Sequence, residues 1–360
     1  MGFLRFLLAM TVVFAHLHFI HPIFGDSRFA VQMFFIISGF YISMIWSEKY
    51  SSLKSPISAF YLSRALRIYP LYYIVLIISI LIAWFGLSSG HISALMALLA
   101  YPVHGALSSS VHLPQLTILG MDIYPFLGRL DDGSLEFLNQ QFAYPRPYIF
   151  EYFFIPQAWS LSLELMFYLI APFILKRTRL LIGLAITSLT LRLILWKYGF
   201  NQDPWTFRAL PLELSLFIAG ALSQKLSTHF GITIKKTAHA NFIFLAIGAI
   251  PIVLTLTIKF ALLTIGESAY WLYYAITLTT LPFLFHATKL YKFDRALGEL
   301  SYPVYISHWL VISTFFVLDI PLENNYPIVI FTIILESFLL NIIQLKIDIF
   351  RNRLAMSKSI

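Results

Sequence analysis

Residues 68–88 read IYPLYYIVLIISILIAWFGLS and contain no charged side chain. A helix of about 20 such residues is long enough to cross about 30 Å of hydrocarbon. Apolar runs of similar length recur along the whole chain and are separated by polar or basic stretches. The apolar content is therefore organised as successive spans, which predicts an all-α integral membrane protein whose helices form one bundle.

The overall composition supports this prediction. Hydrophobic residues fill 59% of the 360 positions and charged residues only 12%, whereas soluble domains have about 45–50% and about 25%. The sequence predicts one membrane domain over residues 1–345, followed by a short basic tail at 346–360. We expect about ten transmembrane helices, at residues 3–22, 29–47, 68–88, 158–175, 180–197, 207–224, 241–258, 269–287, 301–318 and 327–345.

The basic residues predict the orientation of the bundle. If segment 91–107 does not cross, 18 of the 25 Lys and Arg residues fall in one set of loops and tails and 6 in the other, while Arg192 lies within a span. Because cytoplasmic loops carry the excess of Lys and Arg, the larger set and both termini are predicted to be cytoplasmic. Letting 91–107 cross would reverse this asymmetry. We therefore expect 91–107 to be re-entrant or peripheral, within one long outward loop at 89–157 that can cover a site.

Several classes of site and partner are excluded. The chain has no cysteine, so it has no disulfide, no thiolate metal site and no cysteine nucleophile, and no metal is expected. The net charge of +8 does not indicate nucleic acid, because the basic residues lie between apolar runs rather than among exposed aromatic residues. The first apolar stretch lacks a small-x-small cleavage site and contains His16 and His18, which favours a retained span over a signal peptide.

Arg5 and His16 are candidate functional residues within the first span. An ionisable group at the centre of a span costs about 2.5–3.5 kcal/mol, so its presence suggests function. Their separation of eleven residues corresponds to about three turns, which places both on one face about 16 Å apart. We expect Arg5 at the cytoplasmic entrance and His16 near mid-membrane, facing the same crevice. His16 can serve as a general base, although a structural histidine between helices is the alternative.

Two further motifs are found near here: one lies within the second span and the other lies just before the third. Arg64 and Arg67 lie at i and i+3 just before a span, where such a pair can bind phosphates bidentately. Orientation alone also favours basic residues at this edge. Ser38 and Gly39 lie in the second span, where small side chains allow a neighbouring helix or a ligand to come close.

A carboxylate lies about one turn into the span that begins near residue 158. The stretch is Trp159-Ser160-Leu161-Ser162-Leu163-Glu164, and Ser160 lies on the same helix face as Glu164. A glutamate in this position is either neutral or paired. It can orient a histidine or a sugar hydroxyl.

The stretch at 297–308, LGELSYPVYISH, starts another span with a row of hydroxyl groups and ends in a second intramembrane histidine. Ser301, Tyr305 and His308 fall on one face of this helix. For three other intramembrane charges a structural pair is the favoured interpretation: Arg192, Glu213 and Glu336.

Taken together, these segments resemble the membrane O-acyltransferases known as acyltransferase family 3. The resemblance runs from end to end, in the family's order relative to ten spans. This chain departs from the family in having Ala30-Val31-Gln32 where Gly-Val-Asp is common, so no role is assigned to an acid there. The matching blocks are Arg-x10-His as Arg5 and His16, Phe-Phe-x-x-Ser-Gly-Phe as Phe34 to Phe40, Arg-x-x-Arg as Arg64 and Arg67, Trp-Ser-Leu-x-x-Glu as Trp159 to Glu164, and Leu-Gly-x-x-Ser-Tyr-x-x-Tyr-x-x-His as Leu297 to His308.

The resemblance implies an enzyme of the cell (inner or plasma) membrane that works in O-acetylation. The acyl group, usually acetyl, would come from cytoplasmic acetyl-CoA and pass to a hydroxyl of a cell-surface or lipid-linked carbohydrate. Such acceptors include lipopolysaccharide, exopolysaccharide, peptidoglycan and exported glycolipids of the cell envelope. Some members carry an appended esterase-like domain, and the tail at 346–360 is too short for one.

This resemblance also assigns roles to the candidate residues. The catalytic set would be His16 as general base with Arg5 and Glu164, and the donor-binding set would be Arg64, Arg67, Ser38 and Gly39. Substrate-side or supporting residues would be Trp159, Ser160, Ser301, Tyr305 and His308. Whether His16 deprotonates the acceptor or itself carries the acyl group stays open, and the base role is preferred.

Two alternatives of other classes are weighed against this hypothesis. In a proton-coupled transporter or glycolipid flippase, His16, Glu164 and His308 would form a proton relay, and the arginines would only set the topology. A non-catalytic membrane scaffold is disfavoured, because charged residues line up within spans. A transporter would need no CoA binding.

Overall fold

The computed structural model describes residues 1–17, 26–88, 113–129, 135–138, 149, 153–231 and 238–357. Within these residues the chain forms ten α-helices of at least 15 residues, short helical stretches at Trp46–Tyr50, 113–117, Tyr124–Phe126 and Pro156–Ala158, and one small hairpin. Segment 91–107 and the end of the first predicted span, from residue 18 on, lie outside the described residues. The helices are α1 (Gly2–His16), α2 (Ser27–Ile45), α3 (Pro56–Ser88), α6 (Trp159–Ile174), α7 (Thr178–Lys197), α8 (Leu210–His229), α9 (Ala238–Ile265), α10 (Ser268–Thr288), α11 (Lys292–Val317) and α12 (Tyr326–Ser357).

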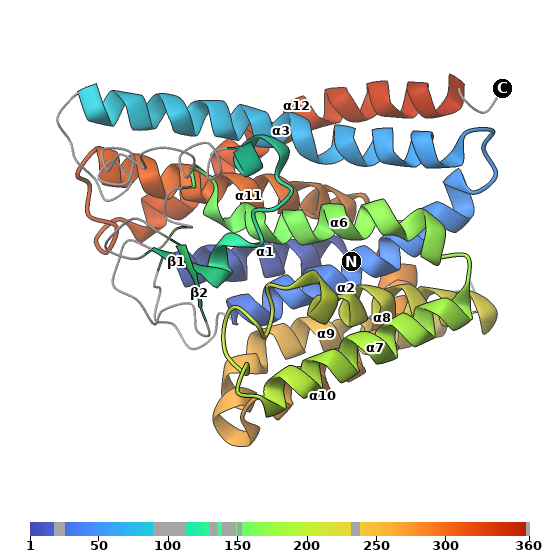
Figure 1. Ribbon diagram of the computed structural model, residues 1–360. Coiled ribbons are helices and arrows are strands. Elements are labelled where there is room, and N and C mark those ends of the chain that lie inside the picture. The colour runs from blue at the N-terminus through green and yellow to red at the C-terminus, as the bar shows by residue number, and fades with distance from the viewer. Residues whose placement is uncertain are drawn as a thin grey trace.

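The prediction of a multi-pass helical membrane bundle is confirmed. Each of the ten predicted spans overlaps one of these helices. Seven described helices are long and apolar enough to cross a membrane, and α1 is a shorter apolar helix. The helices run side by side along one direction, with α3 and α12 at one edge and α7 and α10 at the other (Figure 1). Large apolar side chains such as Ile77, Leu81 and Trp84 are exposed on α3, as expected for a surface that faces lipid.

Glycine residues allow helices α2 and α8 to approach closely at two places. A Cβ added at Gly39 of α2 would lie 1.8 Å from the carbonyl oxygen of Phe217 in α8. A Cβ at Gly220 of α8 would lie 1.9 Å from the carbonyl oxygen of Ile36. Only glycine permits these backbone contacts, so α2 and α8 pack as membrane helices with small residues at their interface do.

Helix α1 lies against α11, and the two are joined at the amino end of α1. Both carboxylate oxygens of Asp294 accept hydrogen bonds from the backbone N–H groups of Gly2 and Phe3, each at 2.8 Å. The α-amino group of Met1 pairs with the same carboxylate at 2.9 Å. These bonds satisfy donors that a helix leaves unpaired at its start, and they fix the position of Arg5 one turn further on.

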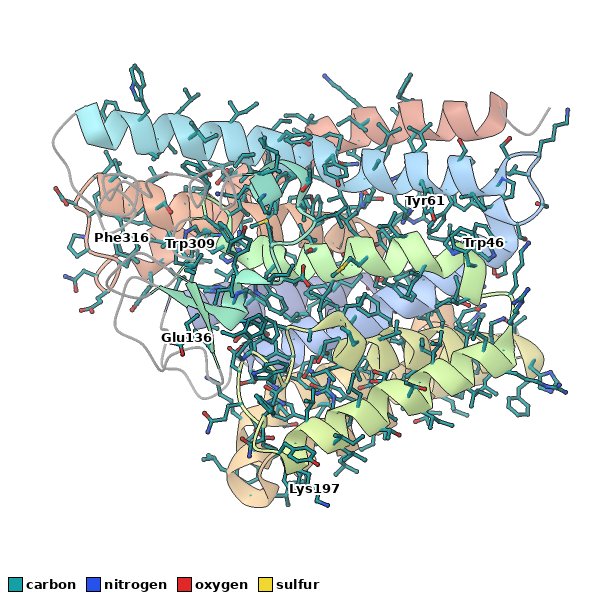
Figure 2. The ribbon with its side chains drawn as sticks, viewed as in Figure 1. Trp46, Tyr61, Glu136, Lys197, Trp309 and Phe316 are labelled. Atoms are coloured by element: carbon teal, nitrogen blue, oxygen red, sulfur yellow. The ribbon has the colours of Figure 1, made fainter. Side chains whose placement is uncertain are left out.

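Within the predicted long loop, residues 113–117 are helical and pack against α3. Tyr69, Tyr72 and Tyr73 donate from their hydroxyl groups to the backbone carbonyls of residues 115–117, at 2.5 to 2.8 Å. Further along, strands β1 (Leu127–Arg129) and β2 (Leu135–Phe137) pair antiparallel, with Gly128 opposite Glu136. The hairpin lies at one end of the bundle, and Trp46 lies at the other (Figure 2).

Candidate functional site

A cavity of about 440 Å³ lies inside the bundle, where seven helices meet. Side chains from α1, α2, α3, α6, α10, α11 and α12 line it. Three of the predicted arginines therefore share one space: Arg5 from α1, and Arg64 and Arg67 from α3. Other lining residues include Ser38, Tyr41, Ser160, Glu164, Tyr168, Ser301, Tyr305, Asp348 and Arg351.

The three arginines differ in how they are paired. Arg67 forms an ion pair with Asp348 of α12 at 3.4 Å. Arg5 and Arg64 form no ion pair with any residue that the structure describes. The guanidinium of Arg5 lies 5.9 Å from the ring centre of Tyr41, and the buried Nε of Arg64 has no hydrogen-bond partner. Unpaired buried cations are costly, so this end of the cavity suits an anionic ligand.

Glu164 lies in the same cavity but contacts none of these arginines as an ion pair. Its Oε1 accepts a hydrogen bond from Ser38 Oγ at 2.7 Å, and the hydroxyl of Tyr168 donates to the same oxygen. Ser38 therefore lines the cavity, whereas the neighbouring Gly39 lies on the α8 side of α2. The sequence did not single out Tyr168, although it lies one turn after Glu164 on the same helix face.

Ser160 and Tyr305 meet further along the cavity wall. Their hydroxyl oxygens are 2.6 Å apart, and Tyr305 Oη also donates to the carbonyl of Gln157 at 3.0 Å. Gln157 Nε2 in turn donates to the carbonyl of Ile306 at 3.0 Å. These bonds tie the start of α6 to α11, so the stretch that contains Glu164 is held against the helix that carries His308.

His16 and His308 form a pair next to Tyr305. His308 Nε2 and His16 Nδ1 are 3.1 Å apart, and the two rings stack with centroids 5.0 Å apart. The ring of Trp309 packs edge-on against His16 at 5.6 Å. Trp309 lies toward the hairpin end of the bundle (Figure 2), which places the histidine pair away from the end that holds Trp46.

The placement of His16 differs from the sequence-based expectation in one respect. Arg5 lines the cavity, but His16 does not, because α1 ends at His16 and its ring packs against α11. The described contacts of Glu164 and Ser160 are also with residues other than His16. The connection from the cavity to the histidine pair runs through Tyr305, whose ring lies 6.1 Å from that of His308.

Of two more candidate residues, Ser301 lines the cavity and Trp159 does not. Ser301 donates to the carbonyl of Gly298 at 2.7 Å. The guanidinium of Arg208 lies over the indole ring of Trp159, 4.4 Å from the centre of that ring. Arg208 is itself held by both carboxylate oxygens of Asp203, at 2.6 and 3.0 Å. Trp159 therefore contributes a cation–π contact beside α6 rather than a cavity wall.

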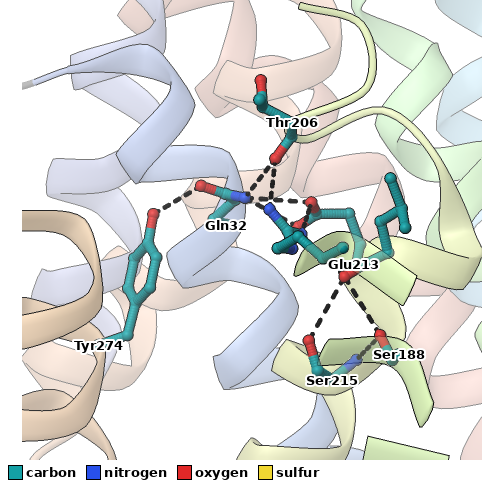
Figure 3. Close-up of polar contacts among 8 residues, drawn as sticks. Gln32, Ser188, Thr206, Glu213, Ser215 and Tyr274 are labelled. Carbon is teal, nitrogen blue, oxygen red and sulfur yellow. Dashed lines mark hydrogen bonds and ion pairs between the residues drawn. The ribbon is translucent and has the colours of Figure 1, made fainter. Parts of the chain in front are cut away.

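Structural pairing was expected for three intramembrane charges, and two of them, Arg192 and Glu213, pair with each other. Glu336 forms no ion pair with any residue that the structure describes. Glu213 also lies beside Gln32 (Figure 3). Arg192 Nη2 lies 2.5 Å from Glu213 Oε1, and its two terminal nitrogens also donate to two backbone carbonyls. Gln32 donates to the same carboxylate at 3.0 and 3.1 Å and accepts from the hydroxyl of Tyr274 at 2.6 Å. Gln32 thus supplies, without a charge, hydrogen bonds that join α2, α8 and α10.

The chemistry available at the site is that of arginine, histidine, carboxylate and hydroxyl groups. Within the part of the chain that the structure describes, no three His, Asp or Glu side chains are grouped to hold a metal ion. The cavity offers cations for phosphate, hydroxyl groups for a polar chain, and a histidine pair beyond Tyr305. This arrangement can hold an extended anionic ligand whose uncharged end points toward the histidines.

Comparison with protein families gives a match over most of the chain. A family model described as an acyltransferase domain matches residues 1–343. The match covers six of the seven helices around the cavity and ends within α12, before its lining residues Asp348 and Arg351. No characterised protein and no solved structure matched the chain.

Proposed function

This chain belongs to the acyltransferase 3 family, and we propose that it transfers an acyl group, usually acetyl, from acyl-CoA to a hydroxyl of a cell-surface or lipid-linked carbohydrate. The observation that carries this proposal is the cavity in which Arg5, Arg64 and Arg67 meet. The nucleotide end of CoA carries several phosphate charges, and such a group needs cations in order to enter a membrane protein. The pantetheine arm is long and largely uncharged, so it fits the part of the cavity between α2, α6 and α11.

Arg64 is the residue that best supports a phosphate ligand. Its Nε is buried and has no partner, and a buried donor without a partner costs about 1–3 kcal/mol. A phosphate oxygen would supply that partner and would also neutralise the guanidinium. Arg67 would contribute less, because Asp348 already pairs with it.

We assign the transfer chemistry to His16. His16 takes the proton from the acceptor hydroxyl, and the acceptor oxygen attacks the carbonyl carbon of the acyl thioester. A C–O bond forms and the C–S bond breaks, and the departing CoA sulfur receives the proton as a thiol. A base that gives and regains one proton balances this reaction without any other reactant. Ser160 and Tyr305 line the cavity, and the ring of Tyr305 lies 6.1 Å from that of His308. Their hydroxyl groups can hydrogen-bond the thioester carbonyl there.

The orientation of the bundle is part of the same proposal. We place the arginine end of the cavity and both termini in the cytoplasm, because acyl-CoA is cytoplasmic and the basic residues predict this side. Single cysteines at Thr228 and Gln202, both exposed, test it in this cysteine-free chain. An impermeant thiol reagent added to intact cells should label Gln202→Cys and spare Thr228→Cys. The opposite pattern would place the donor cavity on the wrong side.

The enzymatic proposal is tested with purified protein in lipid nanodiscs and with envelope glycans. The wild-type protein should bind acetyl-CoA, and cells that carry its gene should show an acetyl mass on an envelope glycan. His16→Ala should keep acetyl-CoA binding and lower transfer by about 10²–10⁴-fold, as loss of a general base does. His229→Ala, at an exposed site near the end of α8, is the matched control and should behave as wild type.

Two results would contradict the proposal. Absence of acetyl-CoA binding by the folded wild-type protein would favour a transporter, which needs no CoA. Retention of more than about a tenth of the transfer rate in His16→Ala would make His16 a structural histidine, since loss of a general base costs far more.

A further inference from the structure

The hydrogen atoms of the histidine pair can be assigned from its surroundings, beginning with His308. Its Nδ1 lies 2.8 Å from the carbonyl oxygen of Tyr305 and 3.3 Å from that of Val304. A carbonyl oxygen only accepts hydrogen bonds. His308 Nδ1 must therefore carry a hydrogen atom, and this bond fixes the ring to the backbone of its own helix.

The remaining nitrogen of His308 is then an acceptor. The His308 side chain is fully buried, and no carboxylate that the structure describes bonds to it. A cation in that place would be costly, so His308 is neutral and its Nε2 has a lone pair. The nearest polar atom is His16 Nδ1 at 3.1 Å. For a hydrogen bond to form between them, His16 Nδ1 must be the donor.

We infer that His308 is a positioning residue, which selects the tautomer of His16 and leaves His16 Nε2 as the nitrogen that takes the acceptor proton. This inference rests on the proposed function. When Nε2 gains the proton, His16 Nδ1 still donates to His308, so the same hydrogen bond holds the ring before and after the transfer. Trp309 and the stacked ring of His308 limit its rotation further.

A neutral histidine suits this position better than the carboxylate that orients the base in a serine hydrolase triad. A carboxylate at His308 would place a negative charge in a fully buried site, at a large desolvation cost. A neutral ring orients His16 without that cost. The backbone carbonyl of Tyr305 completes the chain of hydrogen bonds from α11 to α1.

The tautomer can be measured without any acyl transfer. Nitrogen-15 NMR of histidine-labelled protein in nanodiscs distinguishes protonated from unprotonated ring nitrogens, and the spectrum of His16→Ala identifies the His16 signals. We expect a protonated Nδ1 and an unprotonated Nε2 for His16 in the wild type. The reverse pattern in the wild type would overturn the inference, whatever the activity of the protein.

Two amide variants test the consequence for the reaction. Glutamine places its amide near the position of Nε2, so His308→Gln can donate to the Tyr305 carbonyl and accept from His16. Asparagine is one carbon shorter and leaves His16 without an acceptor. We expect His308→Gln to keep transfer within about tenfold of wild type, and His308→Asn to lose about a hundredfold or more, within the range for a disabled general base.

Each outcome of the amide comparison has a distinct meaning. The Michaelis constant for acetyl-CoA should stay the same in both variants, because neither substitution touches the cavity arginines. An unchanged Michaelis constant also shows that the variants are folded. Equal transfer by the two variants would show that the acceptor at Nε2 is irrelevant, and would refute the positioning role. If the wild type itself transfers no acyl group, the proposed function fails instead, and the NMR experiment still decides the tautomer.

Discussion

Partly buried arginines lie in two regions of this bundle, and the two regions differ in how these arginines are paired. Arg192 has a carboxylate partner in Glu213 and two carbonyl partners, within a network that joins four helices. In the cavity, Arg5 and Arg64 have no ion pair among the described residues, and Arg64 Nε has no partner. A cation that holds helices together is neutralised within the protein. A cation that has to bind a ligand is left for the ligand to neutralise.

The largest expected effect follows from breaking the paired region. Glu213→Leu leaves Arg192 buried without its carboxylate, and breaking a buried pair costs about 3–5 kcal/mol. We expect the free energy of unfolding in detergent to fall by that amount, measured by thermal or denaturant unfolding. The double variant Arg192→Met/Glu213→Leu should recover most of the loss, because replacing a whole buried pair is often neutral. A single variant as stable as the double one would show that the pair does not matter.

A smaller effect, on binding rather than stability, is expected in the unpaired region. Arg64→Gln removes charge-assisted phosphate contacts, each worth about 1.5–3 kcal/mol. The dissociation constant for acetyl-CoA, measured by titration calorimetry, should rise about 10- to 150-fold, with unfolding unchanged. Arg67→Gln should cost less, because Arg67 already shares its charge with Asp348. Arg28→Gln, which lies beside Glu267 and outside the cavity, is the control, and an equal loss there would refute the donor site.

The smallest effects are expected from substitutions of Gly39 and Ser38, which are neighbours in α2 and should affect different properties. Gly39→Ala pushes a methyl group into the backbone of α8 and should lower stability by about 1–3 kcal/mol, as overpacking does. Ser38→Ala removes one hydrogen bond to Glu164, worth about 0.5–1.5 kcal/mol. That loss should appear in the transfer rate and leave the melting temperature near wild type. If Ser38→Ala mainly lowered the melting temperature, Ser38 would belong to the packing and not to the site.

Much of the fold could be predicted from the sequence, because span length and the pattern of basic residues depend only on local composition. The positions of the ten helices were predicted in this way, whereas no pattern in the sequence identified Glu213 as the partner of Arg192. Gly39 could not be assigned, since a small residue in a span serves equally well for a ligand and for a helix. The structure places it against Phe217, whereas Ser38 beside it lines the cavity.

The candidate site could be predicted only in part. Motifs identified Arg5, Arg64 and Arg67, but sequence carries no information on which helices will meet, so the contribution of Asp348 from α12 was not foreseen. The contact of His16 with His308 joins residues 292 positions apart, and no local pattern reports such a contact. Helical spacing placed Arg5 and His16 on one face, yet it could not show that the cavity stops short of His16.

The way the loop segment at 115–117 is held has a consequence for biogenesis. Residues 113–117 are helical, so the carbonyls of residues 115–117 lie in the last turn of a helix, where the helix itself supplies no partner. Backbone groups within a membrane protein need such partners. The tyrosines of α3 are synthesised before this segment and can bind its carbonyls as it emerges. The side chain of Gln115 accepts a hydrogen bond from the N–H of Phe154, just before α6. Gly120, three residues after the segment, donates to Ser162, and that bond forms only after α6 is made. The segment is therefore locked in place by the helix that follows it, after insertion of the helix that precedes it.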